Sequence, residues 1–307
     1  MKKYTVTLFY LLALIVTFAS ANDDILLYKV PNKDHKISAK TIADGFSAAG
    51  YTVAKNQDMN GPYQKQFSKT TFDSYKLMSL YHPDTSVALI SKYARSGIFT
   101  PFSIAVYQRK GDNNLYIALL RAKAQEHIVK VHDPLFKKLE ALNKKTIMKI
   151  LPAAKETSLG YDAVQTDKPL FTKYSFEVDD EDAMDAREEM LMLMTEAMKP
   201  SGFVVANYID FNAVLKDEKK DDYLFYDAYS LCKLKIIYEL CKTKPEAGAF
   251  APCTMVIYHK KGSNKTEIVS LNIDNLTSTL ALKEKALLQL LEKAQSDMQK
   301  IIEEAAE

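Results

Sequence analysis

The three cysteines are the residues best suited to chemistry, and all lie in the second half of this 307-residue chain: Cys232, Cys241 and Cys253. In an oxidising compartment thiols can form a disulfide, bind a soft metal or exchange with other thiols. All three are candidate binding residues, and three interpretations stay open: the thiols are buried and inert, two of them form a disulfide, most plausibly Cys232 with Cys253, or they form a reactive or metal-binding site. No basic neighbour or helix N-terminus that would lower a thiol pKa is evident, which favours inert packing.

A second set of sulfur atoms lies on a predicted helix over residues 182–198. Met190, Met194 and Met198 recur at every fourth position and therefore share one helix face. Outside the cytoplasm such thioethers could hold Cu(I), which makes them weak candidates for a metal site. The alternative is a core-facing stripe of apolar side chains, and this alternative is favoured.

The histidines and carboxylates do not form a recognisable catalytic or metal-binding motif. His259 is expected to be a solvent-facing strand residue, and none of the five histidines is spaced to converge with another on one helix face. Acidic runs at 179–182 and 217–222 are typical of a helix start and a solvated loop. The sequence contains no glycine-rich phosphate loop and no Gly-x-Ser-x-Gly elbow, so we assign no catalytic residue and no cofactor.

The elements that must position these residues occur twice. The segment from Gly97 to Leu120 returns without a gap 151 residues later, at Gly248 to Leu271, with the shared pattern Gly-x-Phe-x-Pro. Such a repeat indicates one structural unit used twice. The repeat also bears on the role of the cysteines: their first-half counterparts are apolar, as expected if the cysteines fill core positions. An alignment with a small gap pairs Cys232 with Met78, Cys241 with Ile90 and Cys253 with Phe102.

Periodicity and turn residues predict the same order of elements in both halves. We expect strands and helices in alternation, then a short helix, a hairpin of two strands and a final helix. The fold class is therefore α+β, with two similar domains, each an antiparallel sheet with helices packed against it. The first domain spans residues 22–151, the linker 152–170 and the second domain 171–307.

The last predicted helix, residues 280–304, carries a short heptad seam. Leu287, Leu291, Ala294, Met298 and Ile301 are spaced four, three, four and three residues apart. The seam is consistent with packing on the helix's own sheet or with a homodimer contact.

Both halves resemble the family of the domain of unknown function 302 (DUF302). The resemblance is carried by Tyr229-Ser-Leu-Cys232, a short helix, Gly248-Ala-Phe-Ala-Pro-Cys253 and a hairpin. The Pro-Cys strand opening is its most specific part. The first half departs from the family pattern with Pro101-Phe102, and the second half lacks the family's Cys-Asn-Pro step. The resemblance implies a tandem repeat of this fold and little chemistry.

The N-terminus has the pattern of an export signal. Lys2 and Lys3 precede an apolar run of about 15 residues, and Ala19-Ser20-Ala21 supplies a small-x-small cleavage site. We expect residues 1–21 to be removed and the mature chain to be periplasmic or secreted, with no membrane span. The full chain has 41 basic and 39 acidic side chains, and removal of Lys2 and Lys3 with the signal leaves 39 of each, a neutral balance that argues against a nucleic-acid partner.

These observations lead to one main hypothesis and one alternative. We expect an exported, non-catalytic protein that binds a small ligand, a metal or a protein partner. The alternative is a thiol-redox or metal-carrying protein that uses Cys232 and Cys253.

Overall fold

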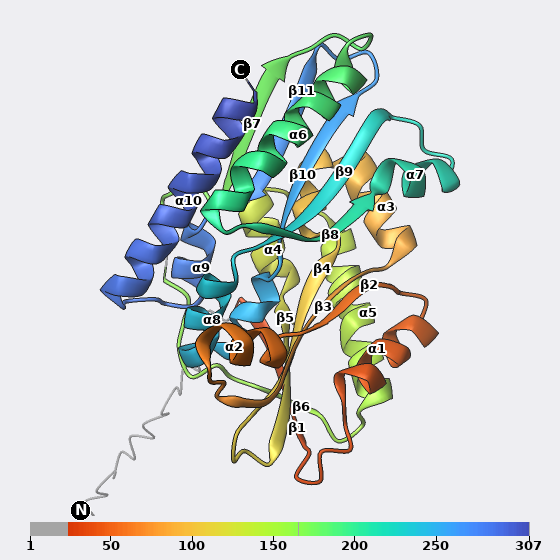
Figure 1. The fold of residues 1–307 in the computed structure, drawn as a ribbon. Coiled ribbons are helices and arrows are strands. Elements are labelled where there is room, and N and C mark those ends of the chain that lie inside the picture. The colour runs from red at the N-terminus through yellow and green to blue at the C-terminus, as the bar shows by residue number, and fades with distance from the viewer. Residues whose placement is uncertain (1–23, 165, 307) are drawn as a thin grey trace, which may run out of the picture.

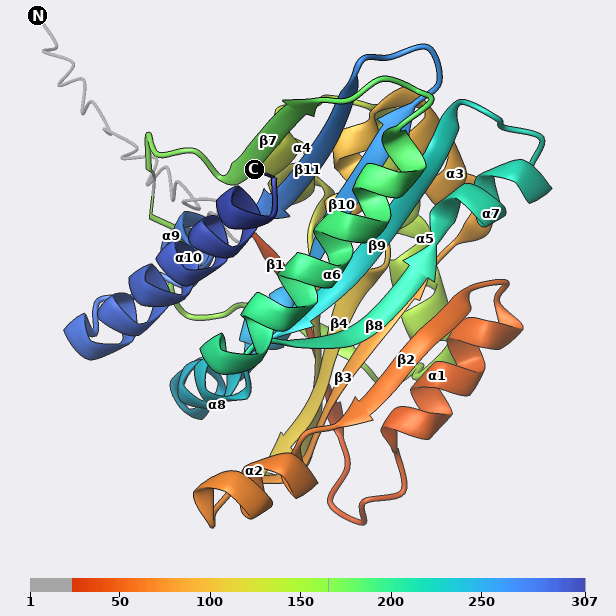
Figure 2. The same cartoon turned by 45° about the horizontal axis from the view of Figure 1, so that its top comes forward.

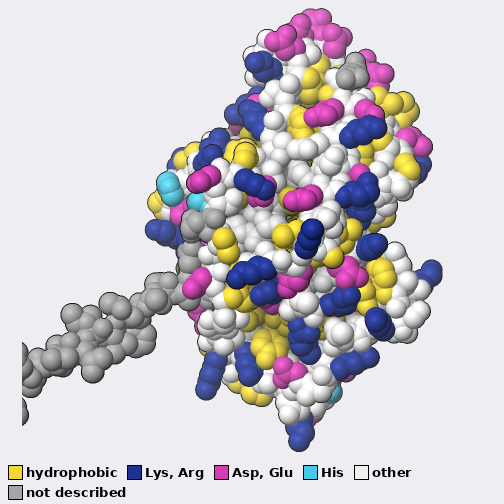
Figure 3. Space-filling model, turned by 90° about the vertical axis from the view of Figure 1, so that its left-hand side faces the viewer, with side chains coloured by type: hydrophobic (Ala, Val, Ile, Leu, Met, Phe, Trp, Pro, Cys, Tyr) yellow, Lys and Arg dark blue, Asp and Glu magenta, His cyan; other side chains and the backbone are white. Residues whose placement is uncertain are grey.

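The computed structural model describes residues 24–164 and 166–306 (Figure 1). The predicted signal segment, residues 1–21, lies outside the described residues. Within the described ranges, no helix is long and apolar enough to cross a membrane. Basic and acidic side chains are interspersed over the face drawn in Figure 3, in keeping with the nearly balanced charge.

Each half is built from the same succession of strands and helices. The first half contains β1 (Ile25–Pro31), α1 (Ala39–Ala48), β2 (Thr52–Asp58), α2 (Asn60–Phe67), β3 (Phe72–Tyr81), α3 (Pro83–Lys92), the 3-10 helix η1 (Ala94–Phe99), β4 (Phe102–Arg109), β5 (Asn114–Leu120), α4 (Ala122–Val129), α5 (Pro134–Ile150) and β6 (Lys155–Thr157). The second half contains β7 (Phe171–Glu177), α6 (Ala183–Ser201), β8 (Val204–Asp210), α7 (Phe211–Asp217), β9 (Tyr223–Cys232), α8 (Leu234–Thr243), the 3-10 helix η2 (Pro245–Phe250), β10 (Cys253–Lys260), β11 (Lys265–Leu271), α9 (Asp274–Thr279) and α10 (Lys285–Ala305).

The strands form two antiparallel sheets with the same internal order. The first sheet runs β2-β3-β4-β5-β1 and adds β6 at its edge, and the second runs β8-β9-β10-β11-β7. The fold class α+β, with helices packed against antiparallel sheets, is confirmed. The short helices α2, α4, α7 and α9 were not expected, because six to eight residues are too few to show a clear helical period.

The repeat offset is constant over a longer segment than the sequence match. The bounds of β3, α3, η1, β4 and β5 all return 151 residues later as β9, α8, η2, β10 and β11. No gap is needed, so Cys232 corresponds to Tyr81. The pairing of Cys232 with Met78 was wrong, because the gap shifted β9 by three residues against β3. Cys241 with Ile90 and Cys253 with Phe102 agree with the constant offset.

Helices cover one face of each sheet. Side chains of α1 and α5 pack with one face of the first sheet, and side chains of α6 and α10 pack with one face of the second. Figure 2 shows α1 beside β2 and α6 lying across the other sheet. The buried stripe of α6 consists of Met190, Met194 and Met198. These two outer clusters belong to one half each.

The opposite faces of the two sheets share a single core. The largest cluster of buried side chains contains residues of both halves, among them Tyr75, Tyr107, Tyr226 and Tyr258. The 3-10 helices lie at this junction, since η1 packs on β10 and β11 while η2 packs on β4 and β5. The two halves therefore complete each other's hydrophobic core.

Paired contacts across the junction explain the glycine of the Gly-x-Phe-x-Pro pattern. Tyr75 Oη donates to the Pro245 carbonyl at 2.6 Å, and its counterpart Tyr226 Oη donates to the Ala94 carbonyl at 2.5 Å. A Cβ on Gly97 would collide with the Tyr226 hydroxyl, and one on Gly248 would collide with the Tyr75 hydroxyl. The repeated glycines are thus required by close approach of the other half's tyrosine.

The heptad seam of the terminal helix α10 packs against other helices of the same chain. Leu287, Leu291, Ala294 and Ile301 are buried, and the helix packs on α6 and α8. A homodimer through this helix would have to use its other, more polar face.

Candidate ligand-binding pocket

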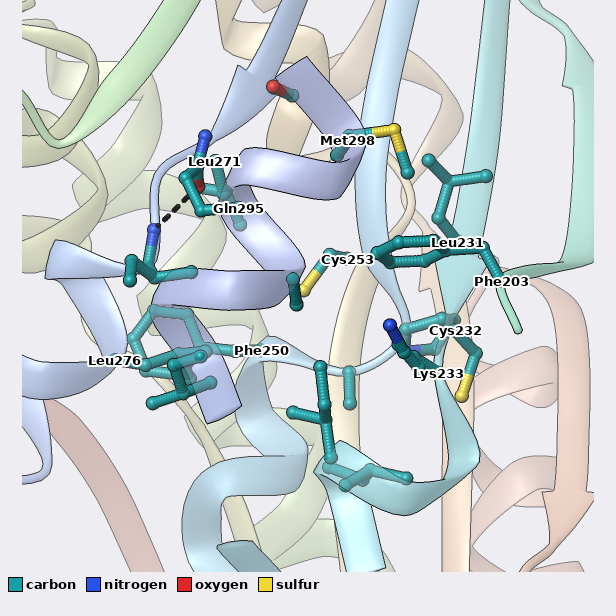
Figure 4. Close-up of a pocket in the computed structure, with 18 of the residues that line it drawn as sticks. Phe203, Leu231, Cys232, Lys233, Phe250, Cys253, Leu271, Leu276, Gln295 and Met298 are labelled. Atoms are coloured by element: carbon teal, nitrogen blue, oxygen red, sulfur yellow. Dashed lines mark hydrogen bonds between the residues drawn. The ribbon is translucent and has the colours of Figure 1, made fainter. Parts of the chain in front are cut away.

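A largely apolar pocket, partly open to the surface, lies at one end of the second sheet and is bordered by α8, α9 and α10 (Figure 4). Its cavity volume is about 120 Å³. Leu231 and Cys253 supply its wall from the sheet, Phe203 its edge beside β8, and Ala294 and Met298 its wall from α10. These side chains are almost entirely hydrocarbon and sulfur, so the cavity suits an apolar occupant.

The local sequence explains how these side chains converge. Cys253 is the first residue of β10 and lies directly opposite Leu231 of β9, so both point to the same face of the sheet. Leu291, Ala294 and Met298 are three and four residues apart on α10, and this spacing puts them on one helix face over that end of the sheet.

The charged groups at the pocket are compensated. Lys233 Nζ lies 3.2 Å from Asp297 Oδ2 and 4.9 Å from the centre of the Phe203 ring. The pKa of Asp297 is lowered, first by its hydrogen bond from Lys293 and further by Lys233. Gln295 Oε1 accepts a hydrogen bond from the Ile273 backbone N–H at 3.1 Å. The pocket therefore offers no unpaired charge to a ligand.

The family comparison falls on this half of the chain. Residues 183–305 match the model of the domain of unknown function DUF302. The match begins with α6 and reaches the end of α10, so it includes every element that lines the pocket.

The solved structures that match part of the chain include one of a DUF302 protein. It is the crystal structure of an uncharacterized conserved DUF302 protein from Bacillus stearothermophilus, with 18% identity and a TM-score of 0.35. The alignment covers 43% of this chain and 95% of that one. No curated protein sequence matches the chain.

The structure separates the three cysteines. Cys232 and Cys253 line the pocket of the DUF302-matched half, whereas Cys241 is fully buried elsewhere, with its Sγ 2.8 Å from Tyr75 Oη. All three are free. Because Cys253 lies opposite Leu231, the next residue, Cys232, points to the other side of its strand, and the two sulfur atoms diverge in Figure 4. This geometry does not bring the pair together as a disulfide.

Burial keeps the thiols protonated. It raises the pKa of Cys232 to about 11 and the pKa values of Cys241 and Cys253 to about 12. A thiol with such a pKa carries almost no thiolate at neutral pH, and thiolate is the form that attacks electrophiles and binds metals.

The other residues singled out from the sequence lie away from the pocket. Met190, Met194 and Met198 are buried between α6 and the second sheet. In the described ranges, no group of three or more His, Cys, Asp or Glu side chains is placed to hold a metal ion. The carboxylate of Asp221, in the second acidic run, forms a surface ion pair with Lys261.

The expectation for His259 was wrong. Its side chain is 0% exposed, with Nδ1 2.9 Å from Thr266 Oγ1 and Nε2 2.9 Å from Asp180 Oδ1. Asp180 also accepts from the Gly262 backbone N–H, which is the main cause of its lowered pKa. The imidazole thus joins the acidic run before α6 to the β10–β11 hairpin.

A buried ion pair was missed by sequence reasoning. Asp227, 1% exposed, lies opposite Asp210 across the β8–β9 ladder, and like charges opposite each other repel. Arg187 of α6 compensates, with Nε 2.5 Å from Asp227 Oδ2, and Tyr208 Oη donates to Asp227 Oδ1 at 2.8 Å. These residues are up to 40 positions apart, so no local motif marks them.

The pocket itself could have been detected from the repeat. Phe102 of the first half lies opposite Leu80, as Cys253 lies opposite Leu231, so the two positions are equivalent. Because a cysteine side chain is much smaller than a phenylalanine side chain, Cys253 in the place of Phe102 indicates unfilled space at this position of the second sheet. What fills or lines that volume could not be inferred, because Phe203 and Ala294 are far from Cys253 in sequence.

Proposed function

We propose that this chain is an exported binding protein of two fused DUF302-type domains, whose second domain takes a small uncharged apolar ligand. The observation that carries the proposal is the apolar cavity of about 120 Å³ beside Cys253. The match to the family over residues 183–305 and the equal strand order of the two sheets support the tandem arrangement.

The size and lining of the cavity support a ligand rather than ordered water. A water molecule needs two to four polar partners, which an apolar wall does not provide. Apolar cavities of about 150 Å³ stay dry and bind benzene or xenon. The pocket here is of similar size, and most of the residues that line it are likewise apolar.

The state of the thiols supports binding over thiol chemistry. Cys232 and Cys253 diverge and are protonated at neutral pH, so the alternative of a redox or metal-carrying pair has no geometric support. Thiol titration of the purified protein separates the two. One fast-reacting thiol, or stoichiometric copper or zinc, would favour the alternative.

Export rests on the N-terminal pattern alone. Lys2, Lys3 and Ala19-Ser20-Ala21 support cleavage after Ala21. Expression in a bacterium, with N-terminal sequencing of the protein outside the cytoplasm, should find Asn22 as the first residue. Retention of residue 1 in the exported protein would exclude cleavage.

Xenon binding to the purified chain tests the ligand proposal. We expect saturable binding of one xenon atom, seen as perturbed NMR signals of the methyl groups around Cys253 and Met298. Cys253→Phe should abolish binding, because the first half accommodates Phe102 at the same ladder position. Cys253→Ala is the matched control and should keep it.

Two results would overturn the proposal. One is the absence of saturable xenon binding to the wild-type chain. The other is undiminished binding in Cys253→Phe, with circular dichroism showing that the variant is folded.

A further inference from the structure

We propose that the preferred ligand is a neutral molecule with a single aromatic ring, which occupies the place that the Phe102 phenyl group fills in the first half. This inference rests on the proposed function and adds the chemical class of the ligand.

The first half shows how a ring packs at this position. Phe102 is buried, and its ring centre lies 6.2 Å from that of Tyr51 at an interplanar angle of 80°. Edge-to-face ring pairs of this kind stabilise a protein by more than the burial of their apolar surface alone would. Tyr51 Oη also donates to Asn143 Oδ1 at 2.8 Å, which closes the site toward α5.

The second half keeps the aromatic partner and loses the ring. Phe203 precedes β8 as Tyr51 precedes β2, so it stands in the position of Tyr51. Cys253 stands in the position of Phe102, and Ala294 in that of Asn143, since α10 and α5 begin 151 residues apart. Both replacements remove side-chain volume where Phe203 still presents a ring face or edge.

Sulfur-containing side chains in the pocket wall also suit an aromatic ligand. Cys253, Met255 and Met298 line the cavity with Phe203 and Phe250. Figure 4 shows the Phe203 ring directed from the start of β8 toward Cys253. Thioether contacts with ring edges favour an aromatic over a saturated ligand.

Charge compensation excludes an ionised ligand. Lys233 is paired with Asp297. The remaining wall is uncharged, mostly apolar with Thr254, Ser270 and Gln295 as its polar members. A carboxylate or ammonium group placed in the cavity would lose its hydration without gaining a counter-ion. The ligand is therefore uncharged.

Competition between ring-sized probes tests this inference. Benzene and cyclopentane have nearly the same size, and cyclopentane lacks the aromatic quadrupole. We expect benzene to bind the purified chain at least fivefold more tightly than cyclopentane, with benzoate at least tenfold weaker than benzene. Ligand-observed NMR titrations measure all three.

Variants separate the aromatic contacts from cavity size. Met298→Leu keeps the volume nearly constant and removes a thioether, so it should lower the ratio of benzene to cyclopentane affinity about twofold. Phe203→Leu should lower the same ratio more strongly, because it removes the retained ring partner. Thermal unfolding of both variants checks that the fold is intact.

The outcomes distinguish this inference from the proposed function. Equal or tighter binding of cyclopentane, or an unchanged ratio in Phe203→Leu, would overturn the aromatic class while xenon binding upholds the pocket. Benzoate binding as tightly as benzene would overturn neutrality. Failure of xenon, benzene and cyclopentane alike would overturn the proposed function itself.

Discussion

The two halves of this chain place different side chains on one scaffold, and the difference is greatest at the end of each sheet. In the first half Phe102, Tyr51 and Asn143 fill the space between β4 and α5. In the second half Cys253, Phe203 and Ala294 leave a cavity in the equivalent space. The pocket therefore arises from lost side-chain volume, without any new element of the fold.

The two halves also differ in an ion pair at equivalent positions of their sheets. Lys76 pairs with Asp58 across the first sheet in a partly exposed ion pair of 2.9 Å. The equivalent Asp227 is buried and depends on Arg187 of α6. Lys76 of β3 is paired with a residue of the neighbouring strand, Asp58, whereas Asp227 at the equivalent position of β9 is paired with a residue of a helix, Arg187.

The largest expected effect comes from breaking the buried ion pair. Arg187→Ala leaves Asp227 buried without its cation, which should destabilise the protein by about 3 kcal/mol or more. Lys76→Ala is the matched control, and a partly exposed pair should cost less than about 1 kcal/mol. Urea unfolding of both variants measures the difference. Equal losses would show that the two ion pairs have the same role.

The next largest effect is expected from creating a cavity in the first half. Phe102→Cys should destabilise the protein by about 3 kcal/mol, because it removes a buried ring and leaves a cavity. It should also raise the number of bound benzene molecules from one to two. A destabilised variant that still binds one benzene would mean that Tyr51 and Asn143 collapse into the space.

A pH-dependent effect should distinguish Cys241 from its first-half counterpart, Ile90. Burial raises the pKa of the Cys241 thiol to about 12, against roughly 8.5 in an unfolded chain. Since the folded state holds this proton more tightly, its contribution to stability is complete below about pH 8.5 and is lost as the pH rises toward 12.

The resulting slope is measurable before most tyrosines titrate. Between about pH 9 and 10 this thiol should lower the free energy of unfolding by up to about 1.4 kcal/mol per pH unit. Cys241→Ala should remove that part of the slope, whereas Ile90→Ala should lower stability equally at both pH values. An unchanged slope in Cys241→Ala, in urea titrations, would contradict the assignment.

The smallest effect concerns the hydrogen bond that closes the first half. Tyr51→Phe leaves Asn143 Oδ1 without its 2.8 Å donor and should cost about 1 kcal/mol. Phe203→Tyr makes the reverse change beside Ala294 and should weaken benzene binding with little change in stability. Urea unfolding and NMR titration measure the pair. No loss in Tyr51→Phe would indicate that water replaces the tyrosine hydroxyl.

Much of the fold could be predicted from local sequence, and the site only in part. Ser38 and Asp133, residue types that favour helix N-caps, accept hydrogen bonds at the starts of α1 and α5, and the repeated hairpin strands are present in both halves as alternation predicted. His259 was misplaced because alternation along a strand does not reveal what a loop from another segment covers. Here the loop is the acidic run, whose Asp180 reaches the imidazole.

The sequence by itself determined the α+β class, the repeat and the loss of a ring at Cys253, because these follow from short-range patterns and a fixed offset. Only the tertiary structure decided that both halves share one core and that Phe203, Cys253 and Ala294 meet around a cavity. The reason is physical. Side-chain volume becomes a pocket only where distant elements pack closely enough to enclose it and rigidly enough not to fill it.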